Sequence, residues 1–329
     1  MAVQKAKDYI GVARQWALGS VALTPQFGHG LAGGGIKVAL SQEPDPLTSA
    51  YLARAGAYRD KVENGAEYTA RAWEKSVGLY LLAALGSVAS PGTGDPSTHV
   101  FTLGSSIPYL TVFEAKGDDT ILAVADCKLD ELAFNWEENQ PVELGVKLVG
   151  TDLSFPATFV ADVNEVDTHT YFSPIGGTFK LDVDSEIPVT ATLVGGSITI
   201  KRSAEAKFYS GDIEAGDVAE SFCEVEVGFT VVPDDLDEWR TIVTGAADGT
   251  SAANSATYGS FEMTFVYGTH SLKFAAAEVA FICDLPEADP AGGAAEVELS
   301  GQCYLASGTP ITVTLTNAHK DYDADLADS

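Results

Sequence analysis

Basic residues are scarce in this chain. It carries 19 Lys and Arg side chains against 47 Asp and Glu, which gives a formal net charge of −28 at pH 7. The deficit is uneven, because residues 1–164 have 12 basic and 19 acidic side chains, whereas residues 165–329 have 7 and 28. Such a surface repels phosphate groups and argues against tight binding of nucleic acid by counterion release. Adaptation to high salt is a second explanation for the acidity.

Long hydrophobic runs are also missing. The most apolar stretch, residues 77–85, is far shorter than the roughly 20 residues that a membrane-spanning helix needs. Charged residues interrupt the apolar positions near the N-terminus, so the sequence predicts no secretory signal, no membrane partner and a protein that is made and kept in the cytosol. The overall balance of 46% apolar and 20% charged residues is that of a folded protein.

Cysteine is rare as well. The four cysteines lie far apart, with no C-x-x-C pair and no histidine at zinc spacing, so we expect free thiols and no metal site. Cys283 and Cys303 could face each other across a hairpin, and the sequence leaves a disulfide between them open.

The common catalytic motifs are absent from the sequence. It has no G-x-S-x-G, no G-x-x-x-x-G-K-[ST] and no H-E-x-x-H, and its five histidines are scattered. Aspartates at positions 321, 323 and 325 lack the glycine and distal glutamate of a calcium loop, so residues 321–329 are predicted to be an acidic tail. We therefore expect a protein that is not an enzyme and needs no cofactor. A glycosidase-like pair of carboxylates is the alternative that sequence leaves open.

Short runs of alternating apolar and polar residues dominate the rest of the chain, as is typical of strands with one buried and one solvated face. Turn residues such as Gly, Pro, Asp and Ser bound these runs. The clearest cases are residues 142–149, 223–231, 261–265, 297–303 and 311–315.

Two segments predict helices. The first, residues 73–85, has leucines at three- and four-residue spacing and ends at Gly86; the second, residues 234–244, opens with acidic residues and ends at Gly245. Each helix is followed at a similar distance by a cysteine and then by an alternating strand, which suggests a duplication. We expect a mainly β protein with two tandem antiparallel β-sandwich or barrel domains, each with one short helix. The predicted parts are an N-terminal arm (1–35), a first β domain (36–152), a connector (153–196), a second β domain (197–320) and the acidic tail (321–329).

Several segments resemble the tail tube proteins, or major tail proteins, of long-tailed phages and related viruses. They are THVFTLGSSIPYLTVFE (98–114), ADCKLDELAFNWEENQPVELGVKLVG (125–150), YFSPIGGTFKLD (171–182), GGSITIKRS (195–203), FAAAEVAFICDLPEADPAGGAAEVELSGQCYLA (274–306) and ITVTLTN (311–317). The likeness covers most of residues 70–320 and is one of pattern more than of an invariant motif.

The resemblance implies a structural protein of the virion tail. Members of the family build rings of six β domains, which stack into a tube around a channel for DNA, and members with two fused domains need three chains for each ring. It implies self-association as the main interaction, with the tape-measure protein and the tail-tip or terminator proteins as further partners. DNA would pass through without specific binding.

Two surfaces follow as expectations. An acidic channel would repel DNA phosphates and let the genome slide, and its lining candidates are the glutamates on wet faces of predicted strands: Glu224, Glu226, Glu262, Glu296 and Glu298. Aromatic residues in two long excursions are candidates for contacts between stacked rings: Tyr51, Tyr58, Phe208 and Tyr209. The alternatives are a tail-tip or baseplate ring protein, which would stop at one ring, and an acidic β-sandwich adhesin or carbohydrate-binding module.

Overall fold

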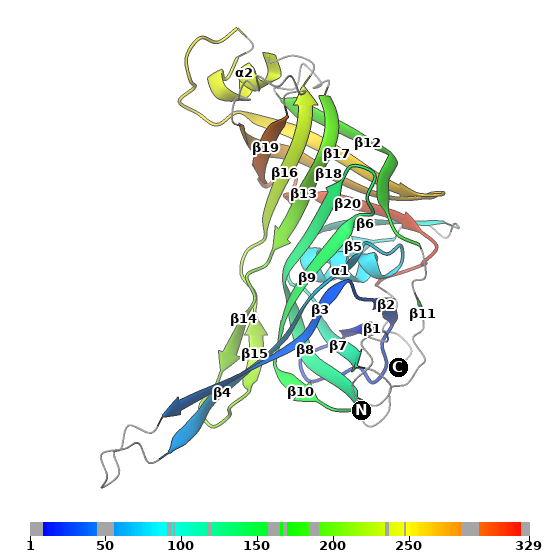
Figure 1. Ribbon diagram of the computed structural model, residues 1–329, viewed down its shortest axis with the longest axis vertical. Coiled ribbons are helices and arrows are strands. Elements are labelled where there is room, and N and C mark those ends of the chain that lie inside the picture. The colour runs from blue at the N-terminus through cyan, green and yellow to red at the C-terminus, as the bar shows by residue number, and fades with distance from the viewer. Residues whose placement is uncertain are drawn as a thin grey trace, which may run out of the picture.

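A computed structural model shows an elongated molecule built mainly from antiparallel strands (Figure 1). It describes residues 9–44, 56–90, 94, 96–116, 120–156, 165–166, 170–183, 191–233, 237–246, 248–283 and 296–323. Helix α2 lies at one end of the molecule and the tip of strands β3 and β4 at the other (Figure 1). The expected fold class, mainly β with two short helices, is confirmed.

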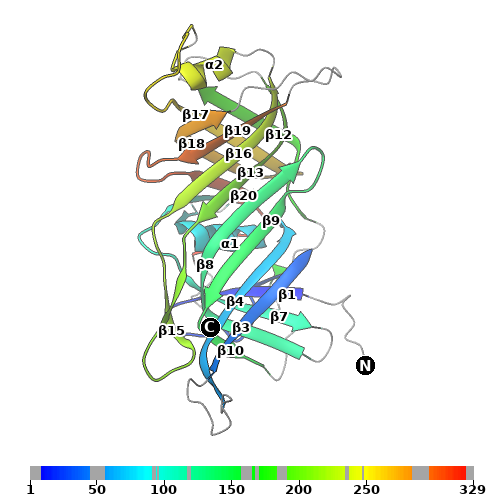
Figure 2. The same ribbon diagram turned by 60° about the vertical axis from the view of Figure 1, so that its left-hand side comes forward.

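One continuous sheet of eight strands, here called the main layer, runs through both halves of the chain. Each strand pairs antiparallel with the next, and together they cross the molecule diagonally (Figure 2). The order is β3 (Gly33–Pro44), β4 (Ala57–Arg71), β9 (Glu143–Gly150), β8 (Thr120–Glu137), β13 (Ala191–Lys201), β16 (Glu224–Pro233), β19 (Val297–Cys303) and β18 (His270–Cys283).

Further strands cover the core side of the main layer. In the first half β1 pairs with β2 and β7, β7 pairs with β8, and β10 pairs with β8. In the second half β12 pairs with β17, β17 and β20 pair with β18, β20 pairs with β6, and β5 pairs with β6. The bounds are β1 (Tyr9–Gln15), β2 (Phe27–Gly30), β5 (Gly86–Ala89), β6 (Ser97–Leu103), β7 (Tyr109–Lys116), β10 (Asp152–Ser154), β11 (Glu165–Val166), β12 (Ser173–Val183), β17 (Tyr258–Tyr267) and β20 (Thr312–Asn317).

Residues assigned from sequence to an N-terminal arm supply β1 and β2. Over its whole length β1 pairs with β7, from Tyr9 opposite Ala115 to Gln15 opposite Tyr109. The domain boundaries given from the sequence all stay predictions.

Both predicted helices are present. Helix α1 (Ser76–Leu85) begins three residues later than predicted, because Trp73 forms a β-bridge with Tyr171 and so does not join the helix. Helix α2 (Asp237–Thr244) ends where expected; residues 234–236 lie outside the described part of the chain. Gly86 and Gly245 follow the helices with φ of 87° and 75°, a left-handed conformation that glycine adopts at little cost.

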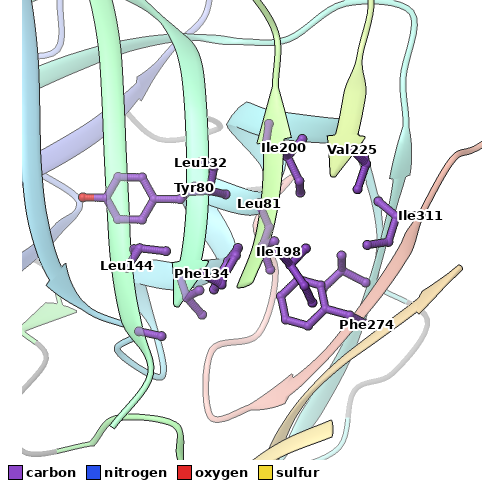
Figure 3. Packing of buried hydrophobic residues seen from close by; sticks show 14 of the residues in the cluster. Tyr80, Leu81, Leu132, Phe134, Leu144, Ile198, Ile200, Val225, Phe274 and Ile311 are labelled. Atoms are coloured by element: carbon purple, nitrogen blue, oxygen red, sulfur yellow. The ribbon is translucent and has the colours of Figure 1, made fainter. Parts of the chain in front are cut away.

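The hydrophobic core continues from one half to the other. Every residue of α1 is buried, and this helix contacts β8 as well as β5 and β6. Where β8 meets β13, Leu132 and Phe134 pack beside Ile198 and Ile200, and all four side chains are fully buried (Figure 3). The two halves therefore share one apolar interior.

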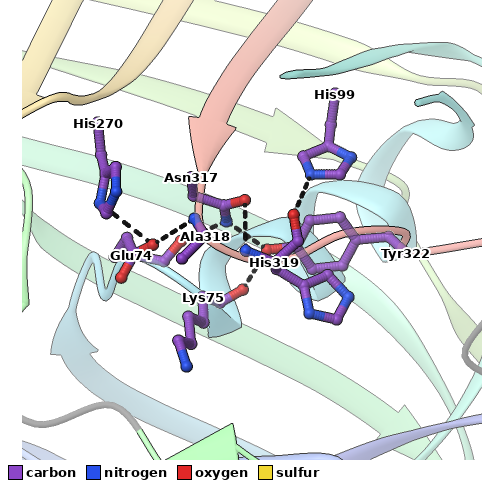
Figure 4. A network of polar contacts seen from close by, with 8 residues as sticks. All are labelled: Glu74, Lys75, His99, His270, Asn317, Ala318, His319 and Tyr322. Atoms are coloured by element: carbon purple, nitrogen blue, oxygen red, sulfur yellow. Dashed lines mark hydrogen bonds and ion pairs between the residues drawn. The ribbon is translucent and has the colours of Figure 1, made fainter. Parts of the chain in front are cut away.

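A buried polar network fixes the segment after β20 against the start of α1 (Figure 4). The Asn317 side-chain amide donates to the Glu74 carbonyl at 2.8 Å and to the Tyr322 hydroxyl at 2.7 Å, and that hydroxyl donates to the Lys75 carbonyl at 2.6 Å. On the other side His270 Nδ1 lies 3.2 Å from the Glu74 carboxylate. These contacts hold Asn317 and Tyr322 against the residues directly before α1, and His270 on β18 contacts the same place.

The strand pairings repeat between the two halves. In the first, β3, β4, β9 and β8 pair in that order; in the second, β13, β16, β19 and β18 do so. Helix α1 follows β4 as α2 follows β16. The pairing of β7 with β8 contains a bulge: residue 110 lies opposite 127, but residue 112 lies opposite 124. The pairing of β17 with β18 contains the same bulge, since residue 259 lies opposite 279 and residue 261 lies opposite 276. This matching bulge fixes which residues of the two halves correspond.

The register also decides the open question of a disulfide. Cys283 lies opposite Leu299, whereas Cys303 lies opposite Val279. The two sulfurs belong to positions four residues apart along the strands, about 13 Å, which is too far for a bridge. None of the four cysteines is in a disulfide.

Candidate assembly and channel surfaces

The main layer has one face toward the core and one face that points away from it, here called the outer face. Apolar side chains such as Leu144, Val146 and Val227 alternate along the strands with charged or small polar ones. The charged side chains of the outer face include Lys37, Lys61, Glu63, Glu67, Arg71, Glu131, Glu137, Glu143, Lys147, Lys201, Glu224, Glu226 and Glu298.

Ion pairs link neighbouring strands across this face in the first half. Lys37 on β3 pairs with Glu67 on β4, and its ammonium group lowers the pKa of the Glu67 carboxyl. Lys147 on β9 lies opposite Glu67, and its Nζ is 2.5 Å from the Asp130 carboxylate on β8. Each exposed ion pair contributes about 0–1 kcal/mol to the free energy of unfolding. These pairs therefore add little stability, and their main effect is to favour this register of the strands.

The ladder of charges continues across the joint between the halves. Lys201 on β13 lies opposite Glu131 on β8, and its Nζ is 2.6 Å from the Glu226 carboxylate on β16. The hydrogen bond to Glu226 raises the pKa of Lys201, so the ammonium stays charged well above neutral pH.

The second half of the outer face is more acidic than the first. The described residues of β13, β16 and β19 carry one basic side chain on this face, Lys201, against Glu224, Glu226 and Glu298. Glu296 is exposed and comes directly before β19. Lys201 neutralises one of these carboxylates, and the rest leave a net negative charge.

Two excursions leave the main layer at the same end of the molecule (Figure 1). One is the extension of the β3–β4 hairpin, and the other is the hairpin of β14 (Glu205–Phe208) and β15 (Ala215–Ala219), which lies between β13 and β16 in sequence. The second excursion reaches back to the first half, where the Val62 amide donates to the Ile213 carbonyl at 2.7 Å. Lys128 and Glu220 fix its base through an ion pair of 2.9 Å.

Comparison with known proteins identifies the family. A family model described as "Phage tail tube protein" matches residues 7–316. This chain belongs to the phage tail tube protein family. A comparison with curated proteins gives no match. The tail tube protein is thus a structural component of the virion tail, and its family assembles into a tube.

The five glutamates that were predicted to line the channel of the tail tube protein do not all lie on one surface. Glu224, Glu226 and Glu298 lie on the outer face, with Glu296 at its margin. Glu262 lies on β17 in the opposite layer, where its carboxylate pairs with Lys273 at 2.7 Å and Lys180 at 3.3 Å. These two ammonium groups lower its pKa. Four of the five candidates therefore share a surface, and which surface lines a channel stays a prediction.

Three of the four inter-ring candidates lie on the two excursions. Tyr58 is half-exposed and donates from its hydroxyl to Glu43 at 2.9 Å, and Tyr209 is exposed at the β14–β15 turn. Phe208 is half-buried, with the Lys61 ammonium 5.4 Å from its ring centre. Tyr51 lies outside the described residues.

Sequence reasoning missed the lysines of the outer face. Lys37, Lys147 and Lys201 come from strands far apart in sequence, and only the pairing of those strands brings them into one row with the carboxylates. Alternation within each strand was the available signal, since all three occupy polar positions. Two further observations concern the described residues alone: they contain no group of side chains placed to hold a metal ion, and no helix with the length and apolar character of a membrane span.

Proposed function

We propose that three copies of this protein close into a ring, that the rings stack into the tail tube, and that the outer faces of the main layers line a channel through which DNA passes. The observation that carries the proposal is the repeat of strand pairings within a single chain. Two like-built units for each chain supply six units for each ring of three.

The joint between β8 and β13 supports a ring built by continuing one sheet. At this joint two four-stranded units already pair edge to edge over seven residues, from Gly195 opposite Glu137 to Lys201 opposite Glu131. A contact of that kind repeated between chains is head-to-tail, and it closes into a ring when the rotation for each step divides a full turn. Closure also removes the exposed strand edges that otherwise cause aggregation.

The charges of the outer face suit a channel for DNA. Its lysines are paired with carboxylates, and Glu224, Glu298 and Glu296 add negative charge that would repel DNA phosphates. The net charge of −28 acts in the same direction. DNA would therefore pass without adhering to the wall.

The excursions are suited to contacts between stacked rings. Both project at one end of the main layer, and they expose Tyr58 and Tyr209. Their partners in a tube would be the opposite edge of the next ring and, at the tube ends, the tape-measure and tail-tip or terminator proteins. Assembly would take place in the host cytoplasm.

Electron cryomicroscopy of the purified protein tests this proposal. The expected result is a tube of stacked rings, each with three copies, in which Glu226 and Glu298 face the channel while Glu262 faces away from it. A monomer at all concentrations, a single ring that does not stack, or a channel lined by the layer of Glu262 would contradict it.

A further inference from the structure

Residues 318–323, here called the strap, follow the last strand of the chain but lie against its N-terminal part (Figure 4). The Ala318 amide donates to the Glu74 carboxylate at 2.8 Å, directly before α1. The His319 carbonyl accepts from His99 Nε2 on β6 at 2.9 Å. The first residues of the strap are therefore fixed to two elements that precede them by 244 and 220 positions in the sequence.

The other end of the strap contacts β1. Arg14 donates from Nη1 to the Tyr322 carbonyl at 3.3 Å, and the same nitrogen lies 3.2 Å from the Asp323 carboxylate. These residues are 308 and 309 positions apart. The strap thus connects β1, β6 and the start of α1, which are three elements of the N-terminal part of the chain.

The Tyr322 side chain fills a slot between these elements, where it is 1% exposed. Its ring centre lies 4.8 Å from that of His99 and 5.8 Å from that of Phe101, both on β6, and 5.9 Å from that of Phe27 on β2. Its hydroxyl donates to the Lys75 carbonyl at 2.6 Å. The ring of a residue near the end of the chain is therefore part of the core around α1.

The slot exists because position 78 has no side chain. Gly78 lies inside α1, and a Cβ atom added there would be 2.1 Å from Cζ of Tyr322. Glycine is otherwise less favourable than alanine inside a helix. Its presence here is explained by the space that the Tyr322 ring needs and not by the helix itself.

We propose that this slot is an intramolecular binding site for the strap and that its closure is required for assembly, so that a chain joins other copies only after its last residues have been made and have docked. The N-terminal part of a chain is synthesised first. Until residue 322 follows, Phe27 and Phe101 lack the ring that covers them. Helix α1 forms one wall of the slot and also contacts β8 of the main layer, so closure is coupled to that layer.

Such a requirement would keep incomplete chains out of a growing tube. The proposal depends on self-association, which is a property of the family, but not on three copies in a ring or on which face lines a channel.

Substitution of Tyr322 tests the requirement through the critical concentration for tube formation, measured by sedimentation of a dilution series. Tyr322→Ala removes the ring and should raise the critical concentration at least about tenfold, because apparent affinity falls with the fraction of chains in the closed form. Tyr322→Phe keeps the ring and loses only the hydroxyl, so it should raise the critical concentration less. Unchanged assembly of Tyr322→Ala would overturn the proposal and leave the proposed ring intact.

Substitution of Gly78 tests the slot from its other side. In the full chain the added methyl group of Gly78→Ala competes with the Tyr322 ring for space, so this variant should also raise the critical concentration at least about tenfold. In a protein that already carries Tyr322→Ala the ring is absent, and Gly78→Ala should cause no further increase. Additive effects in the double variant would show that position 78 acts through α1 and not through the strap, against the proposal.

Hydrogen exchange of the unassembled protein locates the effect and applies even to a variant that forms no tubes. In Tyr322→Ala the backbone amides of β1, β2 and residues 76–80 should exchange at least about tenfold faster than in the unmodified protein, while those of β16 and β19 should not change. Equal acceleration in all these elements would show a general loss of stability, and no acceleration in any of them would show that closure does not order the N-terminal part. Either result would overturn the proposal.

The two proposals of assembly and closure can fail separately. If the unmodified protein formed no tubes, the proposed function would be contradicted, and the pattern of hydrogen exchange would alone decide whether the strap orders β1, β2 and α1.

Discussion

Among single residues, His29 is the histidine whose pKa is shifted most strongly. It is fully buried, its Nδ1 lies 3.2 Å from the Gly30 carbonyl and its Nε2 lies 2.8 Å from the Tyr80 hydroxyl, which accepts in turn from Tyr68. Burial lowers the pKa of His29 from 6.5 to about 4, so the imidazole is neutral in the folded protein. A neutral ring fits this site because it donates one hydrogen bond and accepts another.

This buried imidazole should make stability depend on pH. The unfolded chain takes up a proton near pH 6.5 and the folded chain only near pH 4, so the contribution is complete above pH 6.5 and is lost as the pH falls toward 4. The loss amounts to about 3 kcal/mol. Urea denaturation of the unassembled protein at several pH values measures it, with His29→Gln for comparison. Carboxylates common to both proteins cancel in the difference, and identical slopes for the two would show that His29 is not responsible.

At the level of secondary-structure elements, the glycine that ends α1 can be compared with a second glycine in a loop. Gly86 has a φ of 87°, and a Cβ atom added there would lie 2.3 Å from the Ser106 carbonyl oxygen. Gly308 has a φ of 90° and open space around the same position. Both glycines therefore have a left-handed backbone conformation. Only Gly86 also lies so close to another backbone segment that a Cβ atom would clash with it.

This difference predicts unequal effects of the same substitution. Gly308→Ala should cost about 1 kcal/mol for its left-handed backbone alone, whereas Gly86→Ala should lower the free energy of unfolding by at least about 3 kcal/mol because the segment around Ser106 must also move. Thermal or urea denaturation of both variants gives the comparison. Equal losses would mean that the contact with Ser106 relaxes without cost.

At the scale of the whole molecule, charge opposes assembly. Each copy carries −28, and like-charged copies repel at distances below the Debye length, which is about 30 Å at 0.01 M salt and about 8 Å at 0.15 M. The contacts proposed between copies are backbone pairing and apolar burial, and these depend little on salt.

Tube formation should therefore become more favourable as salt rises from about 0.01 to 0.15 M. Sedimentation of tubes from a dilution series would give the critical concentration, which is expected to fall at least about tenfold over that range. Choline chloride in place of sodium chloride should give the same result, because screening depends on ionic strength. A critical concentration that rises with salt would show that ion pairs between copies dominate the contact.

Local structure could be predicted from the amino-acid sequence alone. Alternation identified β9, β16, β17, β19 and β20, since each is a strand with one dry face, and Gly86 and Gly245 marked the ends of both helices. Such features depend on neighbours within a few residues. The resemblance to tail tube proteins also followed from sequence and is confirmed by the family match.

Which strand faces lie together depends on packing between distant parts of the chain and could not be predicted. Glu226 and Glu262 occupy equally polar positions of alternating strands, yet they lie on opposite layers, because β16 and β17 pack against each other through Phe229 and Phe261, with ring centres 5.3 Å apart. The same holds for Cys283 and Cys303, whose separation follows from the register of β18 and β19. The alternation of apolar and polar residues within a strand predicts which of its faces is solvent-exposed. Which strands place their exposed faces on the same surface depends on strand pairing, which joins residues far apart in the sequence.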